Sequence, residues 1–267
     1  MADGVATMER PILEILADRP ERSERPMLAG PPERPPATAD AAARLATLKA
    51  AIGGFGPGAA TARVKLGLPA LDEALGGGLP RGALHEIAAV DGSAAATGFA
   101  AFLLGRLAAA ARRPVLWMPG TDIYAPGLAR YGLEPSRLLL ADFRRPQALL
   151  RALEEGLRCP GLAAVLGETE EVDLTASRRL QLAAETHGVA CLLLRRSAAR
   201  TASAAVTRWQ VWSASTHGTK PRWRVSLLRC RSGRTGDWLL EGCRETGGLV
   251  VAAALGDRPA QDRVAAR

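Results

Sequence analysis

Short apolar runs alternate with amphipathic stretches through the central part of the chain. Apolar runs of strand length occur at 84–89, 115–118, 138–141, 162–166 and 189–194. Leucine and alanine at helical spacing predict helices between these runs, at 97–112, 146–158 and 175–187. Short, fully apolar strands that alternate with helices are typical of a largely parallel sheet covered on both faces. The pattern therefore predicts an α/β fold.

The hydrophobic pattern changes after residue 208. Between residues 222 and 230, apolar residues such as Trp223 and Val225 alternate with arginine and serine. A period of two predicts a half-buried strand, and 237–242 and 249–254 are expected to be further strands. We expect an antiparallel C-terminal edge to the sheet, with Trp209 and Trp223 in the core.

The first 60 residues differ in composition from the rest of the chain. Prolines crowd the middle of this segment, and a sequence of that kind cannot build a core. We expect residues 1–60 to be a flexible arm with a proline-rich linker between short helices at 11–18 and 39–52. The α/β domain is expected to span 61–256, and residues 257–267 are expected to be a disordered tail.

Composition limits the chemistry that the chain can carry. Its 267 residues and 48% hydrophobic content are enough for one core domain. The four cysteines form no CxxC pair and the three histidines are scattered, so we expect neither a metal site nor a disulfide framework. No apolar run reaches the length of a membrane span, and the N-terminus lacks signal-peptide character. A cytoplasmic location is therefore expected.

Basic residues outnumber acidic residues by 35 to 27, and the surplus is concentrated in one segment. Residues 195–236, which we call the basic segment, contain no acidic residue. Its ten basic residues are Arg195, Arg196, Arg200, Arg208, Lys220, Arg222, Arg224, Arg229, Arg231 and Arg234. Arginine with interleaved aromatic residues such as Trp212 is typical of single-stranded nucleic-acid binding. Arginine and tryptophan are also enriched at protein interfaces, so these residues are candidates for binding either DNA or a protein partner.

A glycine-rich motif precedes the first apolar strand. Residues 66–82 read LGLPALDEALGGGLPRG, and this string before an α/β core resembles the RecA-like recombinases. The resemblance implies a RecA-like core in which the next loop is a phosphate loop, GxxxxGK[ST], that holds ATP. The corresponding loop, 89–99, reads AVDGSAAATGF. It retains Gly92, Ser93, Thr97 and Gly98, and Thr97 is expected to cap the helix that follows.

Three features that a RecA-like ATPase needs are missing from this sequence. The loop has no lysine, and none occurs between Lys65 and Lys220. The water-activating glutamate is expected just after the second strand, where Met118–Gly120 stand, with Asp122 nearby. The magnesium-binding aspartate is expected at the end of the strand 162–166, but Gly167 follows and Glu168 comes one position late. We therefore expect a degenerate phosphate loop, no nucleotide cofactor and no ATPase activity.

Four strings together resemble the ImuA family of RecA-like accessory proteins. They lie at 66–89, 96–100, 173–195 and 221–241. The resemblance implies a role in DNA-damage-induced mutagenesis, within the SOS response and translesion synthesis, and a nucleoid-associated location on damage. The implied partners are an ImuB-like Y-family polymerase homologue, RecA, an error-prone replicative-type DNA polymerase and single-stranded DNA.

The resemblance also bears on two parts of the basic segment. Arg229 and Arg231 match the spacing of two basic residues that reach the neighbouring subunit's nucleotide in RecA-like filaments. We interpret this pair as inherited from a RecA-like ancestor and reused in a surface that binds a partner. That partner could be a second copy of the chain, so self-association is an open alternative. The stretch 197–207 corresponds to the mobile DNA-binding loop of recombinases, although a helix before Trp209 fits its composition equally well.

Two other functions compete with this interpretation. One is a DNA-dependent RecA-like ATPase, which predicts nucleotide binding. The other is an inhibitor of cell division of the SulA type, which predicts binding to a division protein and no dependence on DNA-damage proteins.

Overall fold

The computed structural model describes residues 62–143, 145–170, 172–196, 202–215, 220–243 and 248–255. The expected N-terminal arm at 1–60 and the expected tail at 257–267 lie outside these residues, as does Arg200. Within the described residues a nine-stranded sheet forms the centre of the fold, in the order β11-β10-β9-β8-β3-β7-β6-β4-β5.

One half of the sheet is parallel. Its strands are β3 (Leu84–Ala89), β4 (Val115–Met118), β5 (Leu138–Leu140), β6 (Ala164–Glu168), β7 (Ala190–Arg195) and β8 (Thr207–Ala214). The apolar runs predicted from the sequence are therefore confirmed as neighbouring parallel strands. The sequence analysis missed β8, which pairs in parallel with β3.

The other half of the sheet is antiparallel. β9 (Arg222–Cys230) pairs with β8, β10 (Gly236–Cys243) pairs with β9, and β11 (Gly248–Ala254) pairs with β10. The predicted α/β class with an antiparallel C-terminal edge is confirmed. Trp209 and Trp223 lie in the core as expected, with 1% and 4% of their surfaces exposed.

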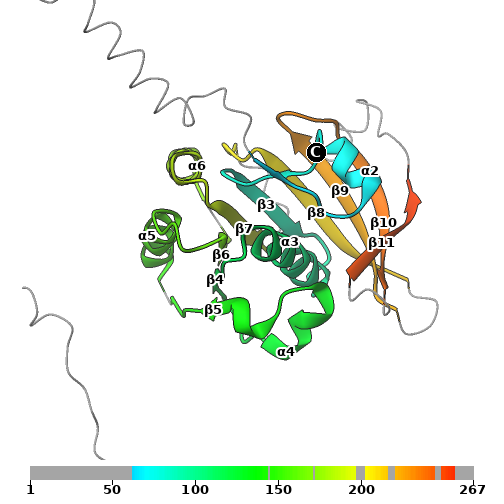
Figure 1. Cartoon of the computed structure of the whole chain (residues 1–267), viewed down its shortest axis with the longest axis horizontal. Coiled ribbons are helices and arrows are strands. Elements are labelled where there is room, and N and C mark those ends of the chain that lie inside the picture. The colour runs from blue at the N-terminus through cyan, green and yellow to red at the C-terminus, as the bar shows by residue number, and fades with distance from the viewer. Residues whose placement is uncertain are drawn as a thin grey trace, which may run out of the picture. The chain divides into compact units, whose positions relative to one another are not determined.

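Helices cover the two faces of the sheet differently (Figure 1). α3 (Ala95–Ala111) packs in an apolar cluster with β3, β4, β7, β8 and the antiparallel strands. α5 (Pro146–Leu157) and α6 (Leu174–His187) pack on the opposite face against β3, β6 and β7. Three short helices, α4 (Ala125–Leu128), η2 (Ala129–Tyr131) and η3 (Pro135–Arg137), connect β4 to β5. Among the described residues, no helix is both long enough and apolar enough to cross a membrane.

The glycine-rich motif forms a compact entry to the sheet. It contains α2 (Pro69–Ala74) and β2 (Leu79–Pro80), and β2 pairs with β1 (Arg63–Val64). Gly78 has a φ of +125°, and a Cβ there would lie 2.6 Å from the carbonyl oxygen of Val64. Only glycine fits this approach between two backbones, which explains why the motif needs glycine at this point.

A buried hydrogen-bond chain connects this entry to the centre of the sheet. His85 on β3 is fully buried; its Nε2 donates to the carbonyl oxygen of Pro80 at 2.9 Å. Thr207 on β8 donates to His85 Nδ1 at 2.8 Å and accepts from Trp209 Nε1 at 2.8 Å. All polar groups in this series of hydrogen bonds are satisfied only when the imidazole is neutral, because Nδ1 must accept the hydrogen bond from the Thr207 hydroxyl. Burial lowers the pKa of His85 to about 4.

The low pKa of His85 predicts that stability depends on pH. The unfolded chain binds a proton at His85 below about pH 6.5, whereas the folded chain does so only near its pKa of about 4. The free energy of unfolding should therefore fall as pH drops from about 6.5 to about 4, by roughly 3 kcal/mol. Urea unfolding at a series of pH values measures this. The slope should shrink in His85→Gln and persist in His187→Gln, whose histidine lies on the exposed end of α6; an unchanged slope in His85→Gln would contradict the assignment.

Candidate functional site

The loop between β3 and α3, residues 90–94, is the counterpart of a phosphate loop. α3 begins at Ala95, so Thr97 lies inside its first turn and the expectation that Thr97 caps the helix is wrong. The capping position is taken by Ala94, whose side chain makes no cap hydrogen bond. Backbone N–H groups at a helix N-terminus attract anions. Here a side chain of the loop itself supplies the negative charge.

Asp91 ties the loop to β8, the strand at which the sheet changes from parallel to antiparallel pairing. Its carboxylate accepts from the backbone N–H of Ser93 at 3.0 Å and from that of Ser213 on β8 at 2.7 Å. Desolvation acts to raise the pKa of Asp91, but the hydrogen bonds from Ser93 and Ser213 outweigh it and hold the pKa below its ordinary value. The loop therefore carries a fixed negative charge, which would repel a phosphate.

Aromatic side chains also pack directly against the first turns of α3. A Cβ at Gly98 would lie 2.6 Å from the indole of Trp223 and 3.3 Å from the ring of Tyr131. These two rings contact each other, with centroids 5.1 Å apart. Gly98 is thus explained by the close approach of β9 to α3, without any contact to a ligand. Gly92, with a φ of +67°, provides the turn that brings Asp91 to Ser213.

The position expected for a magnesium-binding aspartate is accounted for by the packing around β6. β6 continues through Glu168, whose carboxylate accepts from Trp117 Nε1 at 3.0 Å. Gly167 faces the opposite side, where a Cβ would lie 2.8 Å from Leu153 of α5. A carboxylate at 167 would therefore enter an apolar contact. Among the described residues, no three His, Cys, Asp or Glu side chains come together as a metal site.

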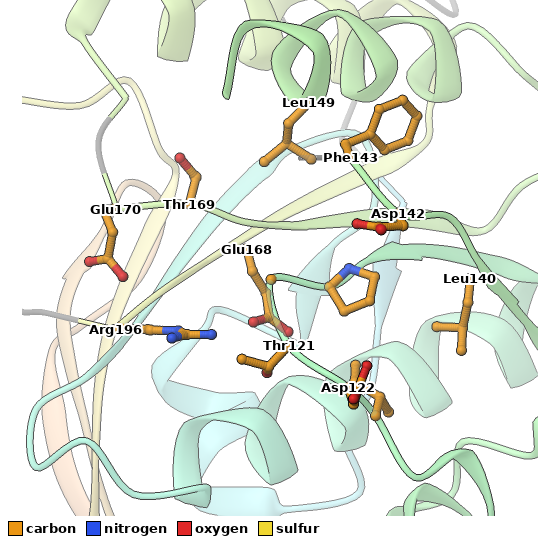
Figure 2. A pocket seen from close by; sticks show the side chains of 13 residues that line it. Thr121, Asp122, Leu140, Asp142, Phe143, Leu149, Glu168, Thr169, Glu170 and Arg196 are labelled. Atoms are coloured by element: carbon orange, nitrogen blue, oxygen red, sulfur yellow. The ribbon is translucent and has the colours of Figure 1, made fainter. Parts of the chain in front are cut away.

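A large open cavity lies at the carboxyl ends of the parallel strands. Its volume is about 1250 Å³, and it is bordered by the segments that follow β4, β5, β6 and β7 (Figure 2). The segment after β4 packs on the α3 side, whereas α6 follows β6 on the other side. In open α/β sheets, ligands bind at the carboxyl ends of the strands, at the point where the connections after neighbouring strands run to opposite faces of the sheet.

The charge of this cavity does not suit a phosphate ligand. Its acidic lining residues are Asp122, Asp142, Glu168 and Glu170. Arg196, the one basic candidate on its border, extends toward Glu168 in Figure 2. Four carboxylates beside one guanidinium leave the cavity acidic, so it does not extend the basic segment into a nucleic-acid site.

The basic segment divides into separate places in the fold. Arg195 is 1% exposed; its guanidinium lies 3.8 Å from the carboxylate of Glu86, which also pairs with Arg208 at 2.9 Å. Ser203 donates to the same carboxylate at 2.5 Å. The structure therefore places Arg195 inside the sheet, out of reach of DNA or a partner.

A second group lies at one end of β9. Lys220 and Arg222 both pair with Glu241 on β10, at 3.5 and 2.5 Å. The hydrogen bond from Arg222 holds the pKa of Glu241 below its ordinary value. Arg224 lies 3.9 Å from the carboxylate of Asp237 and 5.5 Å above the ring of Trp212.

A third group lies at the other end of β9. Arg229 and Arg231 donate to the backbone carbonyls of Ser203 and Ala204, and Arg231 approaches Glu185 on α6 at 3.9 Å. Arg234 pairs with Glu73 on α2 at 2.5 Å. Strands rise about 3.3 Å per residue, so these two groups of arginines lie at opposite ends of β9, with the outward residues of the strand between them.

The acidic partners could not be seen in the sequence of the basic segment. Glu73, Glu86 and Glu185 precede it by many residues, and Asp237 and Glu241 follow it directly. Folding brings them against the arginines by strand pairing and helix packing. Trp117, Trp209, Trp223 and Trp238 are buried, which leaves Trp212 as the tryptophan available for stacking in the described part of the chain.

The sequence of the chain is similar to those of known proteins. Protein ImuA of Caulobacter vibrioides (strain NA1000 / CB15N) is 34% identical over 201 residues, which are 67% of this chain and 82% of that protein. Protein ImuA of a second C. vibrioides strain, ATCC 19089, matches to the same extent. The chain belongs to the ImuA family. No protein-family model matches it.

The ImuA fold is also similar to that of a solved structure. A KaiC-like protein from Pyrococcus horikoshii OT3 superposes with a TM-score of 0.54 and 16% identity, over 72% of this chain and all of that one. At this identity the similarity concerns the fold alone. It agrees with the RecA-like core and antiparallel edge that the sequence predicts for this ImuA-family chain.

The buried carboxylate of Glu86 should be essential to the stability of this ImuA-family fold. Glu86→Gln removes the charge that compensates Arg195 and Arg208, and loss of one partner from a buried ion pair costs about 3–5 kcal/mol. Urea unfolding should show a loss of that size. The control Glu185→Gln removes a half-exposed carboxylate from Arg231 and should change stability by less than about 1 kcal/mol. Equal effects in the two variants would contradict the role given to Glu86.

Proposed function

We propose that this ImuA-family protein is a non-catalytic RecA-like accessory factor in DNA-damage-induced mutagenesis. Membership of the ImuA family is the observation that carries the proposal. The RecA-like core would serve as a scaffold that binds an ImuB-like Y-family polymerase homologue. RecA and an error-prone replicative-type DNA polymerase are further partners that the family resemblance implies.

The absence of catalysis is supported by the geometry of the 90–94 loop. A phosphate loop needs donors and a lysine directed at the phosphates. Here the loop has no lysine, and the Asp91 carboxylate accepts from the N–H of Ser93 in the loop and from that of Ser213 on β8. Trp223 packs directly against Gly98 in the first turns of α3. Trp117 engages Glu168, the carboxylate nearest the position expected for a magnesium-binding aspartate.

Direct DNA binding receives less support than protein binding. Stacking platforms for single strands present several aromatic rings along a continuous basic groove. Here Trp212 is the one tryptophan on the surface of the described residues, and the arginines near it are paired with Glu241 and Asp237. We therefore place a protein partner first and single-stranded DNA second.

Nucleotide should not stabilise the protein. A ligand that binds only the folded state at 100 times its Kd raises stability by about 2.7 kcal/mol. Thermal unfolding with ATP and Mg²⁺ should give the same Tm as without them. A rise in Tm with ATP and Mg²⁺ would instead support the DNA-dependent ATPase.

The full chain should bind an ImuB-like polymerase homologue directly. Affinity capture from damaged cells, followed by calorimetry with the purified partner, measures this. Recovery of cell-division proteins without the polymerase homologue would support the SulA-type inhibitor and contradict the proposal. A salt titration on single-stranded oligo(dT) provides the control for phosphate contacts, which give a steep loss of affinity with salt.

A further inference from the structure

In the part of the chain that the structure describes, no helix packs in an apolar cluster on the outward side of β8, β9 and β10, which is the side opposite α3. On β8, β9 and β10, most side chains that alternate toward α3 are buried, and most that alternate away from it are half-buried or exposed. Ser226 and Asp237 are the buried exceptions among the outward residues that the structure describes, and the Ser226 hydroxyl donates to the Asp237 carboxylate. Among the residues that the structure describes, the apolar cluster beneath α5 and α6 contains none from β8–β11. We call the outward side of these strands the open face.

The open face continues onto helix α6. Arg229 and Arg231 at the end of β9 border a groove of about 330 Å³ whose other wall is α6. Leu174, Arg178, Leu182 and Glu185 lie along that wall, at the spacing of one helical stripe. The groove therefore connects an exposed helix stripe with an exposed sheet face.

Exposed apolar side chains occur at intervals along this surface. Leu182 on α6 is 64% exposed, and Leu228, which stands at the β-bulge of β9, is 40% exposed. Leu228 and Arg208 line a small hollow above Glu86, which places both of them on the open face. Val250 on β11 is also exposed. Exposed leucines beside a groove are typical anchoring points for a protein partner.

The charge on the same surface is mixed but positive in balance. Its basic residues are Arg178, Arg208, Lys220, Arg222, Arg224, Arg229 and Arg231. Its exposed or half-buried acidic residues are Glu185 and Glu241, with Glu86 and Asp237 buried beneath. A surface with both charges and a positive surplus favours a partner that is acidic overall and also carries hydrogen-bond donors for the carboxylates of this surface. A nucleic acid would have to bring phosphates against Glu241 and Glu185.

We propose that the open face and the α6 groove bind an acidic segment of a protein partner that carries apolar anchors. The partner's carboxylates would pair with Arg178, Arg224 and Arg231. Its apolar side chains would pack on Leu182 and Leu228. The inference rests on the proposed function, since it identifies the surface through which the polymerase homologue would be bound.

Two variants of the full chain test the two parts of this surface. Arg178→Gln, Arg224→Gln and Arg231→Gln together remove three exposed charges, and Leu182→Asp with Leu228→Asp removes the anchors. The matched control, Arg113→Gln with Arg151→Gln and Arg158→Gln, removes the same charge from exposed positions before β4, on α5 and just after α5. Thermal unfolding of each variant confirms that the fold is intact.

Calorimetry with the purified ImuB-like polymerase homologue is the readout. Each of the two surface variants should weaken binding by roughly 10-fold or more, as expected for loss of anchoring residues, and the control should stay within about 2-fold of wild type. Binding of all variants with wild-type affinity would overturn the inference while the proposed function stands. Failure of the wild-type chain to bind would overturn the proposed function and this inference with it.

Single-stranded oligo(dT) in the same assay separates a protein surface from a DNA surface. The arginine variant should bind oligo(dT) as wild type does. Loss of oligo(dT) binding in the arginine variant, together with unchanged polymerase binding in the leucine variant, would identify the open face as a nucleic-acid surface and overturn the inference.

Discussion

The charge of Glu86 is the constraint on which the centre of the sheet depends. Its carboxylate lies on β3, between Arg195 of β7 and Arg208 of β8, and almost no water reaches it. A buried carboxylate is costly unless cations and donors surround it. The strand order β7-β3-β8 supplies both arginines, and the sheet changes from parallel to antiparallel pairing one strand further on, between β8 and β9.

The same principle explains why the basic segment is not a uniform basic surface. Each arginine group acquires a carboxylate from another element: Glu241 and Asp237 from β10, Glu185 from α6 and Glu73 from α2. The charges that remain are spread over two ends of β9. A mixed surface of this kind distinguishes between protein partners better than a uniform patch, because a wrong partner meets like charges.

The sequence predicts the fold well and the candidate site only in part. Short apolar runs identified the parallel strands other than β8. The burial of Trp209 and Trp223 was expected as well, since burial on one face imposes a readable alternation on a strand. β8 was missed although Thr207, Trp209 and Val211 alternate with polar residues, because the preceding small and polar stretch suggested a loop or helix. The ion pairs could not be predicted, since their partners are distant in the sequence. The hydrogen bond from Ser213 to Asp91 joins residues 122 positions apart.

That long-range contact has a consequence for how the protein folds. Ser213 and Trp223 are a cross-strand pair of β8 and β9, and they contact the start of α3 at Asp91 and at Gly98. Contacts that close such long loops form slowly, because chain entropy must be lost before the contact stabilises anything. The 90–94 loop therefore has to wait for the β8–β9 hairpin, and we expect it to be among the last parts of the domain to become ordered.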